Sequence, residues 1–273
     1  MRLRTAIAIV ACLAVVGGGI VGLNLSPHQP LLHSVEVSGT VAGAASVQGS
    51  WPTPTTMSAN AKHATSFTVA DAVVPLVQLY SSPNVPVADG AVTVPMHSGT
   101  VMFNPTWEGL PVLFLVKDQK PGWLHVEVSA RPNGFEAWVK ASDVKTRTVP
   151  NWIQVHLNTR QATLMHGDTP LFTTTVAVGR DSAPTPTGGY FVDGIVHLAN
   201  TGGPYGIAQM SVSAFSDIYQ QFGGGVGQIA LHGTNEPGLL GQGVSHGCVR
   251  FANDALQHFL DGAPTGTPVE IDP

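Results

Sequence analysis

Hydrophobic residues in this 273-residue chain occur mostly in short runs separated by turn residues, with one long exception at the start. Arg2 and Arg4 precede about 21 residues without a charged side chain, a length that spans the hydrocarbon core of a bilayer. Basic residues before such a segment favour keeping that end in the cytoplasm. We therefore expect residues 1–25 to be a signal or membrane anchor in or across the cytoplasmic membrane. The rest of the chain is expected outside that membrane, anchored or secreted.

The next segments differ in pattern. Residues 26–67 are rich in Ser, Thr, Ala, Gly and Pro and show almost no periodicity, which indicates a flexible linker. Residues 68–148 hold short strand-like runs separated by "SSPN", "KPG" and "RPNG", so we expect a small β-barrel. The order "GWLHVEV" then "FEAWVKASDV" resembles bacterial SH3-like domains. This part contains no plausible nucleophile, so we expect it to position its neighbour and to contribute little to chemistry.

Residues 149–273 begin with alternating apolar and polar positions in "WIQVHLNTRQATLMHGDTPLFTTTVAVG", which predicts hairpins. The segment 211–225, "SVSAFSDIYQQFGGG", is expected to hold one short helix before the strand "QIALHG". With Gly 31 and Pro 21 in the whole chain and few long helix-forming stretches, the pattern favours a mainly β fold.

Charge narrows the choice of partners. Only 11% of the residues are charged and the formal net charge is −5, so no basic face is available for nucleic-acid phosphates. His156, His166, His197 and His258 are scattered without a metal-ligand spacing. We expect no nucleic-acid partner, no cofactor and a monomer.

Cys248 is the only cysteine outside the N-terminal apolar run, so it has no intramolecular disulfide partner in an exported chain. A thiol of ordinary pKa, about 8.5, is only a few per cent thiolate at neutral pH and needs a base to act as a nucleophile. His232 and His246 are both candidates. Gly247 and Cys248 also present consecutive backbone N–H groups that can stabilise the oxyanion of an acyl-transfer intermediate. A zinc hydrolase using the two histidines and the cysteine is the alternative.

The segments "PTPTGGYFV", "LHGTNEPGLLGQGVSHGCVRFANDAL" and "GAPTGTPVEI" resemble the L,D-transpeptidase catalytic domain of the YkuD type over roughly 120 residues. The resemblance implies a β-sandwich in which Cys248 is the nucleophile and His232 the base, oriented by the carbonyl of Gly233. His246 remains the rival base.

Three further residues are expected to bind substrate. Arg250 stands where another branch of the family has Asn, and its guanidinium suits a substrate carboxylate or an ordering role. The alternative for this residue is a structural ion pair with Asp254. Ser245, in the signature itself, and Tyr205, in a glycine-rich loop before the catalytic strand, are the other two.

The resemblance also implies the reaction. Cys248 would attack the stem tetrapeptide of peptidoglycan at its third residue, release D-Ala, and pass the acyl group to a second stem amine to form a 3→3 cross-link. Trimming of the same tetrapeptide by an L,D-carboxypeptidase and a catalytically silent wall-binding scaffold are the alternatives.

Overall fold

The computed structural model describes residues 64–94, 97–98, 100–106 and 108–273. The expected membrane segment, 1–25, and almost all of the expected linker, 26–67, lie outside the described residues. Within the part of the chain that the structure describes, no helix has the length and apolar character needed to cross a membrane.

Residues 67–149, called here the N-terminal region, form a seven-stranded antiparallel sheet. In order across the sheet, the strands are β11 (Val144–Val149), β1 (Phe67–Ala72), β8 (Leu113–Lys120), β9 (Trp123–Glu127), β10 (Glu136–Lys140), β3 (Tyr80–Ser82) and β4 (Val85–Pro86). Two short pairs flank it, β2 (Leu76–Gln78) with β7 (Val101–Phe103) and β5 (Thr93–Val94) with β6 (His97–Ser98). Strand alternation buries Leu124 and Val126 of β9 beside Val139 of β10, within one hydrophobic cluster.

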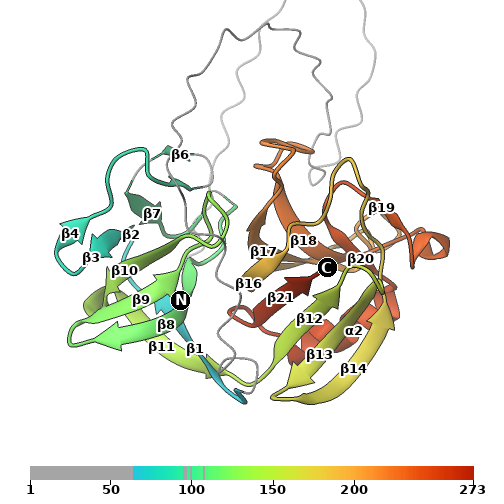
Figure 1. Cartoon of the computed structure of the whole chain (residues 1–273), viewed down its shortest axis with the longest axis horizontal. Coiled ribbons are helices and arrows are strands. Elements are labelled where there is room, and N and C mark those ends of the chain that lie inside the picture. Colours follow the sequence, from blue (N-terminus) through green and yellow to red (C-terminus); the bar gives the residue numbers. More distant parts are fainter. Residues whose placement is uncertain (1–63, 95–96, 99, 107) are drawn as a thin grey trace, which may run out of the picture. The chain divides into compact units, whose positions relative to one another are not determined.

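Residues 150–272, the C-terminal region, form an eight-stranded mixed sheet (Figure 1). Its order is β14 (Thr169–Thr175), β13 (Gln161–His166), β12 (Trp152–His156), β21 (Pro268–Asp272), β16 (Gly188–His197), β17 (Ala208–Phe215), β18 (Gln228–Gly233) and β20 (Val249–Phe251). The pairs β12–β21 and β18–β20 are parallel and the others antiparallel. A short parallel pair, β15 (Val178–Gly179) with β19 (Gly243–Ser245), accompanies them. The hairpins predicted for residues 152–179 are present as β12–β13 and β13–β14.

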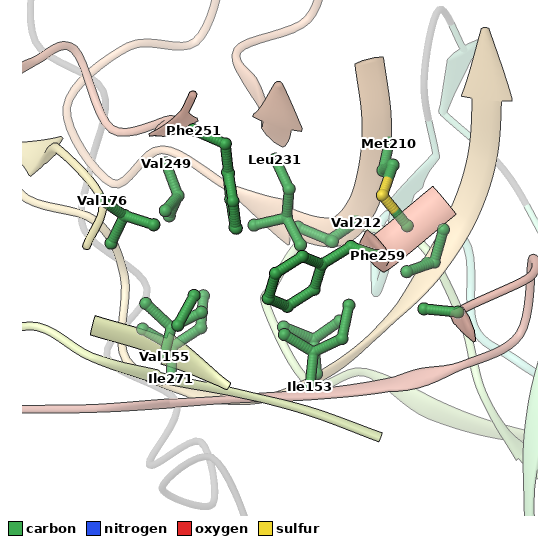
Figure 2. Close-up of a cluster of buried hydrophobic side chains, with 14 of the residues drawn as sticks. Ile153, Val155, Val176, Met210, Val212, Leu231, Val249, Phe251, Phe259 and Ile271 are labelled. Carbon is green, nitrogen blue, oxygen red and sulfur yellow. The ribbon is translucent and has the colours of Figure 1, made fainter. Parts of the chain in front are cut away.

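The core of the C-terminal region lies between the two halves of this sheet. Figure 2 shows Ile153, Val155 and Ile271 on one side of the core and Leu231, Val249 and Phe251 on the other. Phe259 of helix α2 (Asn253–Gly262) lies between them and is fully buried. Two packed layers of strands with side chains meeting in the middle are the arrangement of a β-sandwich. The prediction of a mainly β fold is confirmed.

One element was predicted wrongly. No helix forms in 211–225: residues up to Phe215 continue strand β17, and a loop follows. The reason is burial with a period of two, since Met210, Val212 and Ala214 all point into the core from this strand. The α-helix of the described C-terminal region is α2, which buries Leu256 and Phe259.

A third hydrophobic cluster joins the two regions. Its fully or nearly buried members are Phe67, Val69, Leu113, Leu115, Val149, Trp152 and Phe191. The SH3-like identity of the first domain and the domain boundary near residue 149 remain predictions.

Candidate active site

The parallel ladder between β18 and β20 brings the predicted nucleophile, base and arginine together. His232 of β18 lies opposite Arg250 of β20. Cys248 directly precedes β20, two residues before Arg250, and its thiol forms a hydrogen bond with the main chain of Ala230, two residues before His232. Side chains two residues apart on a strand point to the same face. The residues between them are in the core, so this set lies on the outer face of the sheet.

The turn before Cys248 is held by Ser245. Its hydroxyl donates to the Cys248 carbonyl at 2.6 Å and accepts from the Gly247 N–H at 3.1 Å. Gly247 has φ 125°, and a Cβ there would lie 2.8 Å from Ile229 Cδ1. Glycine is therefore required for this backbone conformation, which side chains rarely adopt.

These contacts change two expectations. Ser245 is 1% exposed and its hydroxyl is used inside the turn, so the structure does not present it to a substrate as predicted. The Gly247 N–H, expected to stabilise an oxyanion, is directed at Ser245 instead. The oxyanion role of the Cys248 N–H stays a prediction.

Thr185 supports the same turn and was missed in the sequence. Its Oγ1 donates to the Gly247 carbonyl at 2.8 Å and accepts from the Gly179 N–H at 2.9 Å. The side chain is 3% exposed. The signal in the sequence was the position of Thr185 between two prolines in "PTPTGGY", a segment that served above only as part of the family resemblance.

His232 has the geometry of a general base. It is 3% exposed, and its Nδ1 lies 2.6 Å from the Gly233 carbonyl. Because a carbonyl only accepts, Nδ1 must carry the proton, which leaves Nε2 of the neutral ring free to accept one. Burial lowers the pKa of His232 to about 4, with Arg250 acting in the same direction and the Gly233 carbonyl opposing it. The predicted orienting role of Gly233 matches this contact.

Cys248 is half-buried. Burial raises the pKa of its thiol, while the hydrogen bond between the thiol and the main chain of Ala230 and the charge of Arg250 act in the opposite direction. Together with the lowered pKa of His232, this makes a neutral thiol and a neutral imidazole the resting state at pH 7.

Arg250 pairs with Glu236, not with Asp254. Its Nη1 lies 3.6 Å from Glu236 Oε2, whose side chain is 59% exposed. Asp254 Oδ1 accepts instead from the Ala255 N–H at 2.8 Å, within the first turn of α2. Arg250 Nε is buried and, among the described residues, has no hydrogen-bond partner. The alternative ion pair is therefore wrong, and a substrate-binding or ordering role remains a prediction.

Tyr205 lies beside the catalytic pair. Its ring makes an edge contact with His232 at 4.8 Å between centroids. Burial raises the pKa of its hydroxyl, and a negative charge on Cys248 adds to this effect. The neighbouring Gly206 makes the approach possible, because a Cβ there would lie 2.7 Å from the Cα of Gly233. The position is compatible with the predicted substrate contact.

His246, the rival base, lies in different surroundings. Its ring packs on Phe222 at 4.8 Å and on Tyr219 at 5.8 Å between centroids. Burial lowers its pKa, with the charges of Arg180 and Arg250 adding to the effect. Arg180 Nη2 also donates to the Tyr219 hydroxyl at 3.1 Å. His246 thus belongs to an aromatic group with the loop of residues 216–227, called here the aromatic loop.

The N-terminal region holds the aromatic loop in place through Arg131 and Asn133. The Arg131 guanidinium donates to three main-chain carbonyls at 2.8, 3.1 and 3.2 Å, those of Ser216, Tyr219 and Val226. Asn133 exchanges two hydrogen bonds of 2.8 Å with the backbone of Phe215, just before the loop. The "RPNG" segment indicated only a turn, because its partners are more than 80 residues away in sequence.

The donor set of the zinc alternative is not assembled. Among the described residues, no group of three or more His, Cys, Asp or Glu side chains is placed to hold a metal ion. His232 and His246 have the separate environments described above.

Comparison with known proteins gives a consistent result. A family model for the L,D-transpeptidase catalytic domain, YkuD, matches residues 150–271. The putative L,D-transpeptidase YkuD of Bacillus licheniformis is 34% identical over 126 residues, covering 46% of this chain and 68% of that protein. The Bacillus subtilis protein of the same name is 33% identical over 124 residues, covering 45% of this chain and 67% of that protein.

Solved structures are more distant. A mutant of the Enterococcus faecium L,D-transpeptidase aligns with a TM-score of 0.36 and 19% identity, over 44% of this chain and 49% of that one. L,D-transpeptidase 3 from Mycobacterium tuberculosis aligns with a TM-score of 0.39 and 13% identity, over 72% of this chain and 82% of that one. The match thus spans about half the length of the Enterococcus chain. On the family model and the two Bacillus relatives, the chain belongs to the YkuD family of L,D-transpeptidases.

Proposed function

We propose that the protein is a peptidoglycan L,D-transpeptidase, a cysteine acyltransferase that forms 3→3 cross-links. One observation carries the proposal: His232 has its Nδ1 proton fixed on the Gly233 carbonyl, on the sheet face that also carries Cys248. This arrangement leaves one ring nitrogen to take the thiol proton. The family membership supplies the substrate class, the stem peptides of peptidoglycan.

The reaction follows from the neutral resting state. Cys248 Sγ attacks the carbonyl of the third stem residue as its proton passes to His232 Nε2. The tetrahedral intermediate expels D-Ala, whose nitrogen takes the proton from the imidazolium, and a thioester remains. An amine of a second stem then attacks, its proton passes through His232, and Cys248 leaves as a thiol. A general base that is neutral above about pH 4 remains competent in mildly acidic medium.

There are two alternatives. If water instead of the second amine attacks the thioester, the protein is an L,D-carboxypeptidase. If no thioester forms, the protein is a wall-binding scaffold. The proposal places the enzyme outside the cytoplasmic membrane, with residues 1–25 as anchor or signal and an SH3-like domain ahead of the catalytic one. Its support is the apolar N-terminal segment and an immobile extracellular substrate.

A single incubation separates these outcomes. The chain without residues 1–25 is mixed with a disaccharide tetrapeptide, and the products are weighed by mass spectrometry. A cross-linked dimer with loss of D-Ala supports the proposal, whereas tripeptide alone indicates the carboxypeptidase. No product and no mass gain on Cys248 would leave the scaffold.

A further inference from the structure

Asn253, the first residue of helix α2, uses its side chain for a contact outside its own helix. Its Oδ1 accepts a hydrogen bond from the Ile207 N–H at 3.3 Å. Asparagine commonly caps the start of a helix, but the N-cap position of α2 is Ala252, which makes no side-chain cap hydrogen bond. The Asn253 side chain therefore connects α2 to the loop of residues 198–207, which precedes β17 and is called here the Tyr205 loop.

The contact lies where the backbones of two glycines meet. A Cβ on Gly206 or on Gly233 would overlap the Oδ1 of Asn253, so this oxygen lies against both glycines. A Cβ on Gly233 would also lie only 3.0 Å from the Gly206 Cα. The Asn253 side chain thus fills the space that a side chain on either glycine would occupy. It holds together the Tyr205 loop, the end of β18 and the start of α2.

These two glycines adjoin the groups that surround the predicted base. Gly206 follows Tyr205, whose ring contacts His232, and Gly233 supplies the carbonyl 2.6 Å from His232 Nδ1. The tautomer and the orientation of a histidine ring are set by the partner of its second nitrogen. A shift of the Gly233 carbonyl would therefore turn Nε2 of the ring away from the Cys248 thiol.

We propose that Asn253 is a positioning residue, which holds the Gly233 carbonyl and the Tyr205 loop in place around His232. This inference rests on the proposed function, because it requires His232 to be the base of an acyl transfer. The asparagine acts through the main chain and carries no charge. A displacement of about 1 Å at a catalytic group can cost about 10²-fold in rate, so loss of this support should be measurable in the kinetics.

The first test compares Asn253→Ala with Asn151→Ala. Asn151 is the matched control, because its Nδ2 donates to the Gly262 carbonyl at 2.7 Å, at the opposite end of the same helix. Each change removes one asparagine hydrogen bond that connects α2 to another segment. With a disaccharide tetrapeptide as donor, kcat for D-Ala release should fall about tenfold in Asn253→Ala, with KM within about twofold of the unaltered protein. Asn151→Ala should keep kcat within about twofold.

The second test uses Asn253→Asp, which keeps the hydrogen-bond acceptor and adds a negative charge. The charged and titratable groups around the His232 ring, which this substitution leaves in place, are Tyr205, Cys248, Arg250 and the ion-pair partner of Arg250, Glu236. A negative charge favours the imidazolium, so the pKa of His232 should rise and the acidic limb of kcat/KM should move about one pH unit higher. At pH 7 the rate should stay within about threefold of the unaltered protein. A residue that only stabilises the fold would leave the limb in place.

The inference is wrong if Asn253→Ala releases D-Ala within twofold of the Asn151→Ala rate. If circular dichroism shows that Asn253→Ala does not fold, Asn253→Asp decides alone, and an acidic limb at the same pH as in the unaltered protein overturns the inference. In both of these outcomes the unaltered protein still acylates Cys248, so the proposed function stands. If no donor acylates Cys248 in the unaltered protein, the proposed function fails and the positioning role fails with it.

Discussion

Replacing Arg131 by alanine tests whether the N-terminal region shapes the active site. Arg131 is the described side chain that ties the aromatic loop at three separate carbonyls, and its guanidinium also lies 5.0 Å from the Phe215 ring centre. Removing it frees the backbone that positions Tyr219 and Phe222 against His246. The loop then keeps the hydrogen bond from Arg180 to the Tyr219 hydroxyl, the ring contacts with His246 and the Asn133 bonds at Phe215.

The size of the effect follows from these bonds. A hydrogen bond from a charged donor contributes about 1.5–3 kcal/mol net, and three bonds from one guanidinium share a single desolvation cost, so we take about 3 kcal/mol for the set. If about half of this free energy, roughly 1.5 kcal/mol, acts on the equilibrium between ordered and open loop, the equilibrium constant for loop ordering falls about tenfold. We expect kcat/KM for acylation of Cys248 to fall about tenfold.

The assay measures acylation by a small β-lactam donor with intact-mass detection over time. Arg147→Ala is the matched control: Arg147 pairs with Asp71 at 2.7 Å within the N-terminal region and donates to Thr265 of the C-terminal region at 3.1 Å, but does not contact the aromatic loop. Arg131→Lys keeps the charge but loses the fork and should recover only part of the rate. If Arg131→Ala acylates within twofold of the Arg147→Ala protein, the N-terminal region does not act on the site through this loop.

Three further outcomes are expected. Cys248→Ala should abolish mass gain from any acyl donor while the melting temperature stays nearly unchanged, and an adduct on that protein would refute the nucleophile assignment. The acidic limb of kcat/KM should fall near pH 4 rather than near 6.5, because the pKa of His232 is lowered in the folded protein. His232→Ala should slow acylation by about 10²–10⁴-fold, and a loss below about threefold would transfer the base role to His246. Ser245→Ala should lower the free energy of unfolding by about 2–4 kcal/mol in urea titration, since it leaves the Gly247 N–H and the Cys248 carbonyl without their partner, whereas a loss below 0.5 kcal/mol (about the noise of surface changes) would mean that the turn is held by Thr185 alone.

The hydrophobic pattern was sufficient to predict the strands that pair with strands close in sequence. The hairpins β12–β13 and β13–β14 are closed by local turns and could be predicted from alternation alone. The segment 211–225 was misjudged because Ser, Ala and Gln residues are compatible with a helix, and only the neighbouring strands make the buried face of β17 visible. Periodicity within a short segment carries no information about which strands will lie on either side.

In the candidate site too, the residues that could be predicted from sequence are those whose partners are close in sequence or on one strand ladder. The family pattern gave Cys248, His232 and Gly233, whose roles depend on residues close in sequence or on one ladder. It did not give Arg131, because the partners of that side chain are backbone carbonyls, which any residue supplies. The family pattern also predicted that Ser245 binds substrate, because a sequence motif does not distinguish a hydroxyl that contacts a ligand from one that forms hydrogen bonds within a turn.

The parallel pairing of β18 and β20 has a consequence for how this enzyme tolerates change. The distance between His232 and Cys248, the predicted base and nucleophile, is set by the backbone ladder, in which Leu231 lies opposite Val249 and His232 opposite Arg250. In the connection between these strands, residues 235–242 are exposed or half-buried and precede β19, so they do not set that distance. Insertions and deletions in this segment are therefore expected to alter the range of substrates without changing the distance between the Cys248 thiol and the His232 imidazole. Substrate range and catalytic chemistry can then evolve independently in the same short stretch of chain.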